Sequence, residues 1–267
     1  MPIVLLAAGL GSRYGGVKPL APVGPDGQPL LAIALRQAAD AGFDRAVVVV
    51  GEQTEQPIRH ALGAPPLPVS FRLQGRIGPA RLKPWGTTAA VLSAVGHSDL
   101  VIANGDDLYG VEGLAAARDW ITSASGADGA AVLYEAGRTI SSRGGVSRAV
   151  PTITDGRLVG LVEERDVCRG PDGVIRTTDG RGLAEEQPVS MNLWCLRLTA
   201  IEALQVSFRL FVARNADDVD AELGLSTAIG ELLGALRVDA LVTRSPWHGV
   251  TFASDVADVR AALRDAD

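Results

Sequence analysis

Two cationic side chains stand in a glycine-rich stretch that follows an apolar run near the N-terminus. The stretch Leu5–Gly24, LLAAGLGSRYGGVKPLAPVG, carries Arg13 and Lys18 among closely spaced glycines. Backbone N–H groups of a glycine loop can surround a phosphate, because glycine lets the chain approach it closely. The two cations would add charge-assisted hydrogen bonds of about 1.5–3 kcal/mol each. This stretch therefore predicts polyphosphate binding.

A pair of carboxylates follows a second apolar run. Asp106 and Asp107 come directly after this run in the stretch VIANGDDLYG. Carboxylate oxygens suit Mg²⁺, which keeps several of its waters and bridges substrate phosphates. The pair predicts a magnesium site, with capping of the helix that begins near Val111 as the alternative.

Strand-like and helix-like segments alternate through the first half of the chain, and they must position both groups. Strands are expected at 3–7, 46–50, 69–73, 100–103 and 130–134, and helices at 29–41, 54–62, 87–95 and 111–121. This alternation is typical of right-handed βαβ crossovers and a mostly parallel sheet. Ligands of such sheets bind at the carboxyl ends of the strands, where the glycine loop and the carboxylate pair both fall.

The pattern changes after about residue 138. Strand-like segments at 146–150, 158–163 and 189–196 are separated by turn-rich stretches, which indicates an inserted β-rich lobe. Helices are expected at 200–212, 218–236 and 256–263, and a strand at 238–242. We expect the 267 residues to form a single domain with two halves, one over about 1–137 and one over about 138–267.

The composition argues against several classes of protein. The net charge of −6 disfavours a nucleic acid or an anionic membrane as partner. No apolar run approaches the roughly 18 residues of a membrane helix, and the N-terminus has no secretion signal, so a cytoplasmic protein is expected. Cys168 and Cys195, the only cysteines, have no metal-ligand spacing. The sequence does not determine the oligomeric state, and it is compatible with a homo-oligomer.

Two familiar phosphate loops fit the glycine stretch poorly. A P-loop requires lysine directly after its second glycine, whereas Val17 follows Gly16 here. In the dinucleotide-binding pattern the third glycine would come one residue before Gly15. Polyphosphate binding therefore has to follow another signature.

The stretch resembles the signature of the nucleotidyltransferases that activate sugar phosphates: an apolar strand, L-A-A-G-x-G-[ST]-R, a short spacer and K-P-L. Further stretches are similar to that family's motifs in the same order, namely KPWGTTAAV, VIANGDDLYG, SSRGGV, LVGLVEER, VSMNLW and WHGVTFASD. The resemblance implies an α/β fold, a Rossmann-like three-layer sandwich with a mostly parallel sheet and an inserted β-rich acceptor-binding lobe. It also implies that the half over about 1–137 is the nucleotide-binding half and the half over about 138–267 the acceptor-binding half.

The resemblance also implies the reaction and the residues that perform it. A nucleoside monophosphate would pass from a nucleoside triphosphate to a phosphorylated small-molecule acceptor, most often a sugar 1-phosphate, with Mg²⁺ as cofactor, giving a nucleotide sugar and pyrophosphate. The implied catalytic residues are Arg13, Lys18 and Asp106. The implied nucleotide-binding residues are Leu6, Ala8, Gly9, Gly11, Ser12, Lys83, Gly86 and Thr87. The implied acceptor-binding residues are Asp107, Gly145, Glu164, Arg165 and Asn192. The implied metal ligands are Asp106 and Asp255.

Three positions depart from the family's pattern. Arg81 stands nearest to the place where many relatives carry a glutamine, so the nucleobase stays open. Arg165 replaces the lysine of the family's Glu-Lys pair, which changes reach and geometry. Where many relatives place a second metal-ligating aspartate after a tryptophan, His248 follows Trp247. Either Asp255 is the second metal ligand instead, or Asp106 binds the metal with Asp107 and water.

Three alternatives remain beside this prediction. A cytidylyltransferase for a phosphorylated polyol, amino alcohol or phosphonate would keep the chemistry and change the acceptor. A regulatory subunit would bind nucleotide without turnover, which the presence of the predicted catalytic residues disfavours. A dinucleotide-dependent oxidoreductase is disfavoured by the glycine spacing and by the absence of an obvious acidic residue ending the second strand.

Overall fold

The computed structural model describes residues 1–11, 14–75, 77, 79, 81, 83–96, 98–141 and 143–265. The longer strands are β1 (Pro2–Ala7), β2 (Arg45–Val50), β3 (Val69–Leu73), β4 (Leu100–Asn104), β6 (Gly129–Glu135), β7 (Val146–Thr154), β8 (Arg157–Arg169), β11 (Pro188–Leu196) and β12 (Val238–Val242). The two-residue strands are β5 (Asp107–Leu108), β9 (Ile175–Arg176), β10 (Gly182–Leu183) and β13 (His248–Gly249). The helices are α1 (Leu30–Asp40), α2 (Glu55–Leu62), α3 (Thr87–Ala94), α4 (Val111–Thr122), α5 (Leu198–Arg214), α6 (Leu225–Leu232) and α7 (Asp255–Asp265), with short 3-10 turns η1 (Lys18–Leu20) and η2 (Ala136–Arg138).

Parallel strands form the half of the sheet that the N-terminal segments build. Strands β3, β2, β1 and β4 lie side by side and run parallel. Strand β11 lies antiparallel between β4 and β6, and β6 pairs in parallel with β12. Because Leu6 of β1 lies opposite Asn104 of β4, the loops that follow these two strands leave the sheet at the same edge. The expected mostly parallel sheet is confirmed.

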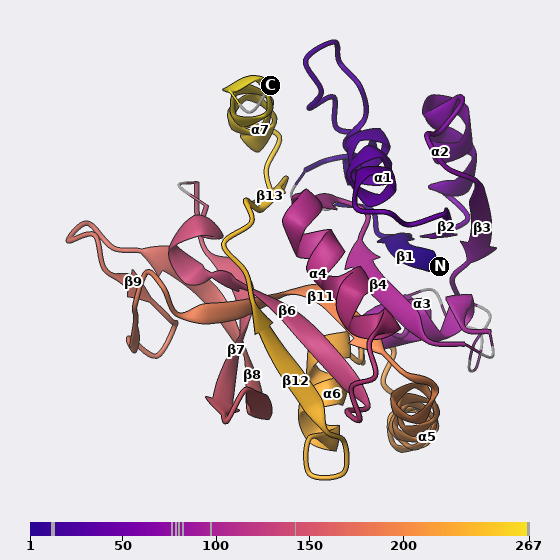
Figure 1. Ribbon diagram of the computed structural model, residues 1–267, viewed down its shortest axis with the longest axis vertical. Helices are drawn as coiled ribbons and strands as arrows, with labels where there is room; N and C mark the ends of the chain where they lie inside the picture. Colours follow the sequence, from indigo (N-terminus) through magenta and orange to yellow (C-terminus); the bar gives the residue numbers. More distant parts are fainter. Residues whose placement is uncertain are drawn as a thin grey trace.

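Helices cover both faces of this sheet, as Figure 1 shows. Successive side chains of a strand point to opposite faces, so Ile3 and Leu5 belong to one apolar cluster and Val4 and Leu6 to the other. The first cluster includes buried residues of α1, α2 and α4, and the second includes buried residues of α3, α5 and α6. The three-layer arrangement therefore follows from strands that are apolar on both faces.

The second half of the chain adds the β-rich lobe. Strands β7 and β8 form a long antiparallel hairpin, and β9 and β10 extend it at the left of Figure 1. Strand β7 also pairs with β11 through Ala149 and Ser190, which joins the lobe to the sheet that carries β4. The expectation of an inserted β-rich lobe is confirmed.

The expected helix over 218–236 is wrong in its first part, since α6 begins only at Leu225. The preceding residues form a loop that bonds to a distant segment. The Leu223 N–H donates to the Trp85 carbonyl at 2.9 Å, and the Leu223 carbonyl accepts from the Thr88 N–H at 3.1 Å. Because this contact joins segments that are far apart in sequence, no local pattern indicates it. The apolar spacing alone therefore predicted a helix that is too long.

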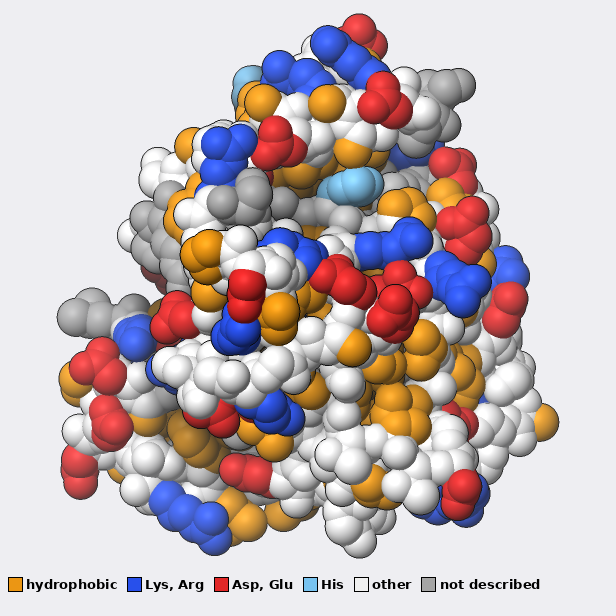
Figure 2. Space-filling model, turned by 90° about the vertical axis from the view of Figure 1, so that its left-hand side faces the viewer, with side chains coloured by type: hydrophobic (Ala, Val, Ile, Leu, Met, Phe, Trp, Pro, Cys, Tyr) orange, Lys and Arg blue, Asp and Glu red, His pale blue; other side chains and the backbone are white. Residues whose placement is uncertain are grey.

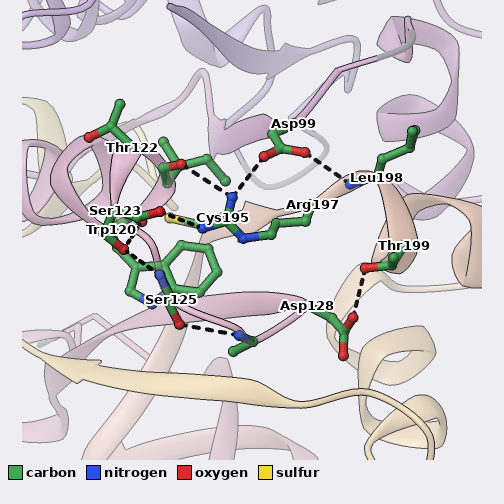
Figure 3. Close-up of polar contacts among 12 residues, drawn as sticks. Asp99, Trp120, Thr122, Ser123, Ser125, Asp128, Cys195, Arg197, Leu198 and Thr199 are labelled. Carbon is green, nitrogen blue, oxygen red and sulfur yellow. Dashed lines mark hydrogen bonds and ion pairs between the residues drawn. The ribbon is translucent and has the colours of Figure 1, made fainter.

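Arg197 joins three segments at the end of β11 (Figure 3). Its guanidinium lies 3.0 Å from the Asp99 carboxylate and donates to the Ser123 carbonyl at 2.9 Å. It also lies over the Trp120 ring, 5.0 Å from the centroid. The second Asp99 oxygen accepts the Leu198 N–H at 3.0 Å, so one carboxylate holds both this cation and the N-terminus of α5.

We expect Asp99→Ala to lower the free energy of unfolding by about 1–2 kcal/mol, the usual cost of losing a helix-capping side chain. Urea denaturation followed by circular dichroism measures this loss. The control is Asp119→Ala, which removes an ion pair whose Asp119 side chain is 65% exposed and should change stability little. Equal stability of the two variants would contradict a structural role for Asp99.

The exterior carries both signs of charge. Acidic and basic side chains are interspersed over the face that Figure 2 shows, rather than separated by sign. Among the helices of the described residues, none combines the length and the apolar character needed to cross a membrane.

Candidate active site

Lys18 and Asp106, far apart in sequence, meet at the edge of the sheet. Lys18 follows the glycine loop after β1, and Asp106 follows β4. Since β1 and β4 are parallel neighbours, both segments leave the sheet at the same edge. The Lys18 ammonium lies 3.5 Å from an oxygen of Asp106, and the two side chains are 20% and 28% exposed. A cation and a carboxylate are thus held together within reach of solvent.

The glycine loop folds back beneath Lys18. The Gly11 N–H donates to the Gly16 carbonyl at 3.2 Å, which closes the loop. A Cβ at Gly11 would lie 2.4 Å from Cγ of Lys18, so only glycine leaves room for the lysine stem. Two predicted residues of this loop, Ser12 and Arg13, lie outside the described residues.

The neighbouring carboxylate, Asp107, is buried with 8% exposure. One of its oxygens accepts the Asn104 amide at 2.9 Å and the Tyr109 hydroxyl at 3.3 Å. Burial first, and then the charge of Asp106, raise the pKa of Asp107 to about 7. Burial also raises the pKa of Asp106, and Lys18 opposes that rise. The pair is therefore an electrostatically costly arrangement of negative charge.

This carboxylate pair fits a magnesium ion. A divalent cation would relieve the cost of two adjacent carboxylates, one buried and one partly buried, and would favour their charged forms. The described residues contain no cluster of three or more His, Cys, Asp or Glu side chains arranged for a metal. Mg²⁺ does not require one, because one or two carboxylates with water and substrate phosphates satisfy it.

Two clefts meet at Asp106. We call the first the wide cleft; it has a volume of about 760 Å³. It is lined by the predicted nucleotide-binding residues Leu6, Ala8, Gly9, Gly86 and Thr87, among others. We call the second the narrow cleft; it has a volume of about 350 Å³. Its lining includes Lys18, Asp107, Arg148, Glu163 and Asn192. Asp106 lines both clefts and so stands where two ligands would touch.

Gly86 lets two distant segments close one wall of the wide cleft. Its φ is +94°, and a Cβ there would lie 2.5 Å from the Leu223 carbonyl oxygen. The next residue, Thr87, accepts the Leu225 N–H on its hydroxyl at 2.8 Å. The start of α3 and the loop before α6 are therefore in direct contact, which the sequence pattern did not indicate.

Lys83 and Arg81 lie in the same region but differ in placement. The Lys83 ammonium lies 3.4 Å from Glu222 and 3.6 Å from Asp220, outside the lining of the wide and narrow clefts. Arg81 lines the wide cleft, and its guanidinium lies 3.9 Å from the centroid of the Trp85 ring. An arginine stacked on an indole thus occupies the wall nearest to the family's glutamine position.

Asn192 lies in both clefts in an uncommon backbone conformation. Its φ is +63°, and the pairing of β11 with β6 shifts register between Ser190 and Leu193 at this point. The Asn192 amide oxygen accepts the Ser226 hydroxyl at 3.1 Å. A bulge and a left-handed asparagine together turn this side chain toward the clefts, a device often found at functional sites.

The structure places Glu163 of β8, rather than Glu164, in the narrow cleft. Successive strand residues face opposite ways, and Glu164 forms an ion pair with Arg181. Arg165 is exposed and does not line the narrow cleft. A signal for this was available, because the glycine-x-x-Glu spacing counted from Gly160 falls on Glu163.

Gly145 is packed against the opposite strand of the hairpin rather than in a cleft lining. A Cβ at this position would lie 2.6 Å from Cα of Asp166 in β8. The residues that follow, Ser147 and Arg148, do line the narrow cleft. The contribution of Gly145 that the structure shows is therefore the close approach of the two strands.

Asp255 holds its own turn at the start of α7. One carboxylate oxygen accepts the N–H groups of Thr251 and Phe252, both at 2.8 Å. The other lies 3.9 Å from Arg143. Thr251 itself lines the narrow cleft, so Asp255 fixes a segment beside the site. Its role as a metal ligand stays a prediction.

Sequence reasoning missed Arg148 as well as Glu163. Arg148 is 7% exposed and lines the narrow cleft from β7. The sequence pattern also did not indicate that β13 pairs with β5. In this pair Gly249 lies opposite Asp107, which brings the C-terminal motif to the carboxylates. No local pattern distinguishes Arg148 from the other arginines of this arginine-rich chain.

Comparison with known proteins identifies the family. The profile of the MobA-like NTP transferase domain matches residues 3–206, most of the chain. The chain belongs to this family. The matched range includes Lys18 and Asp106, which lie in the segments that follow the parallel strands β1 and β4. The chain thus belongs to a nucleotidyltransferase family, and the family-level prediction made from the glycine-rich signature is confirmed.

One curated relative and two solved structures show what this chain is similar to. The chain is 27% identical over 247 residues to the bifunctional protein GlmU of Chromohalobacter salexigens, covering 92% of this chain and 50% of GlmU. The chain thus spans about half the length of this curated relative. The inositol-1-phosphate CTP transferase of T. maritima superposes with a TM-score of 0.65 at 12% identity, over 99% and 96% of the two chains. HddC of Yersinia pseudotuberculosis, complexed with GMP-PN, superposes with a TM-score of 0.62 at 18% identity, over 98% and 99%. These structures establish the Rossmann-like fold.

Proposed function

We propose that this nucleotidyltransferase moves a nucleoside monophosphate from a nucleoside triphosphate to a phosphorylated acceptor, a sugar 1-phosphate, in a Mg²⁺-dependent reaction that gives a nucleotide sugar and pyrophosphate. The observation that carries the proposal is the 3.5 Å contact of Lys18 with Asp106 at the meeting point of the two clefts. The wide cleft would hold the triphosphate and the narrow cleft the acceptor. This division corresponds to the two halves that we expect on either side of residue 138.

The chain's own side chains would align and neutralise two anions. An oxygen of the acceptor phosphate attacks the α-phosphorus in line, the new P–O bond forms, and the bond to the bridging oxygen of the leaving pyrophosphate breaks. Lys18 would donate to the triphosphate and offset the charge that develops on pyrophosphate. Asp106, with Asp107 behind it, would hold Mg²⁺, which would supply positive charge to neutralise the phosphates.

The narrow cleft also supports a second acceptor class. Its lining offers carboxylate, amide and hydroxyl groups from Glu163, Asn192, Ser190 and Ser226, which would suit several hydroxyl groups of a polyol phosphate. The inositol-1-phosphate CTP transferase shares the fold. A cytidylyltransferase for a phosphorylated polyol is therefore the second candidate.

A pyrophosphate-release screen tests the proposal. Each of the common nucleoside triphosphates is combined with sugar 1-phosphates and polyol phosphates, with magnesium present and then chelated by EDTA. We expect release with at least one pair and its loss on chelation. Tight triphosphate binding without release from any pair would favour the regulatory-subunit alternative. Release that survives chelation would remove the metal from the proposal.

A further inference from the structure

Arg148 is a buried cation that has no carboxylate within ion-pair distance among the described residues. Its side chain is 7% exposed, on β7. Its hydrogen bonds go to neutral oxygens: Nε donates to the Thr139 hydroxyl at 3.2 Å, one terminal nitrogen to the Ser147 carbonyl at 2.7 Å, and the other to the Thr139 carbonyl. Burying a cation with no carboxylate in direct contact is costly, so an arginine held in this way points to an anionic ligand.

The guanidinium is fixed in orientation and still has donors to spare. Three of its five N–H bonds hold Thr139 and Ser147, and the remaining two have no partner among the described residues. The Trp247 ring lies 5.1 Å from its central carbon. Burial lowers the pKa of Arg148 to about 10, against the opposing charge of Asp107, so the guanidinium stays protonated at neutral pH.

The position of Arg148 matches the place where two anions must meet. It lines the narrow cleft together with Lys18 and Asp106. The same three residues also line an adjoining hollow of about 390 Å³ beside the glycine loop. Lys18 comes from the loop after β1, whereas Arg148 comes from the β-rich lobe on the other side. The site thus offers one cation from each half of the chain.

The strand that would supply the acceptor-side cation by resemblance does not bring one into the cleft. The residue after Glu163 is Glu164, which forms an ion pair with Arg181, and Arg165 is exposed outside the narrow cleft. Arg148 lies opposite Glu164 in the β7–β8 register, next to the pair of Ala149 with Glu163. Among the described residues of these two strands, Arg148 is the cation that lines the narrow cleft.

Building on the proposed function, we infer that Arg148 binds the phosphate of the acceptor. The planar guanidinium can donate two parallel hydrogen bonds to a phosphate monoester, and it would offset the repulsion between that phosphate and the α-phosphate. Glu163 would face the remainder of the acceptor. The acceptor class that follows is a phosphate monoester of a polyhydroxy compound, since the rest of the lining is rich in oxygen ligands for hydroxyl groups.

The test is binding of inorganic phosphate to the full chain saturated with magnesium and a non-hydrolysable nucleoside triphosphate. The analogue fills the triphosphate site, so calorimetric titration with phosphate reports the acceptor site. We expect Arg148→Gln to weaken phosphate binding at least about 10-fold, the effect of losing one charge-assisted contact, with an unchanged affinity for the analogue. The control is Arg157→Gln, at an exposed arginine at the start of β8, which should bind phosphate as the wild type does.

The outcomes separate this inference from the proposed function. If wild type does not bind the analogue, the proposed function fails first. If wild type binds the analogue and Arg148→Gln binds phosphate equally well, the inference alone is wrong. If Arg148→Gln does not fold, Arg148→Lys tests the inference instead, because it keeps the positive charge and removes the planar guanidinium that donates two parallel hydrogen bonds. We expect it to weaken phosphate binding at least about 3-fold, and an unchanged affinity would overturn the inference.

Discussion

Replacing Lys18 by alanine is expected to lower kcat by at least about 100-fold, the scale of losing one preorganised charge contact in a transition state. The ammonium is 20% exposed and lies 3.5 Å from Asp106, so it is held at the meeting point of the two clefts before any ligand arrives. A contact that strengthens as charge moves onto pyrophosphate acts on kcat more than on KM. Steady-state pyrophosphate release with the acceptor found in the screen measures the loss.

Lys83→Ala is the natural comparison, because Lys83 is the only other lysine. Its ammonium contacts Asp220 and Glu222, and Lys83 itself lines neither cleft, although Glu222 lines both. We therefore expect a loss below about 10-fold, as for a screened surface contact. Lys18→Arg keeps the charge but not the compact shape and should recover only part of the rate. A kcat for Lys18→Ala within about 3-fold of wild type would remove Lys18 from the mechanism, since a transition-state contact costs far more.

Asp106→Asn is expected to lower kcat by at least about 10³-fold and to abolish the response to magnesium, since metal coordination contributes several kcal/mol to such reactions. The substitution keeps the shape of the side chain and removes its charge. Because Asp106 lines both clefts, its loss should affect both substrates. A magnesium titration of the initial rate, with EDTA-treated enzyme as the starting point, provides the measurement.

Asp107→Asn distinguishes the two members of the carboxylate pair. Asp107 is more buried and is already engaged by Asn104 and Tyr109, so it is placed to support the metal site from behind. We expect this variant to keep a magnesium response, shifted to higher concentration, with a smaller loss of rate than Asp106→Asn. The reverse order of the two variants would make Asp107 the principal ligand. Far-ultraviolet circular dichroism of both variants checks that the fold is retained.

The elements of the nucleotide-binding half could be predicted because their signals are local. Strand β3 begins and ends where the apolar residues placed it, as does β12 of the other half. Helix α4 differs from the prediction by one residue at one end, and α1 by one residue at each end. Side-chain periodicity within a segment is fixed by its own backbone geometry, so a sequence window contains it. The meeting of Lys18 with Asp106 then follows from parallel neighbouring strands.

Other features depended on contacts between distant segments. The loop before α6 is not helical, because Leu223 bonds to Trp85 and Thr88. The C-terminal motif comes to the carboxylates because Gly249 of β13 pairs with Asp107 of β5. In each case the contacting residue lies outside the local stretch of sequence, so the local pattern could not predict the contact.

By itself, the sequence determined the family, the α/β alternation and the two loops that face one edge of the sheet. Only the tertiary structure decided that Glu163 rather than Glu164 lies in the narrow cleft, and that Arg148 is buried beside Asp107. The physical reason is that strand residues alternate between faces, so a shift of one position reverses a side chain. Which arginine becomes buried depends in turn on register and packing across the whole hairpin, and neither is written in any short stretch of the chain.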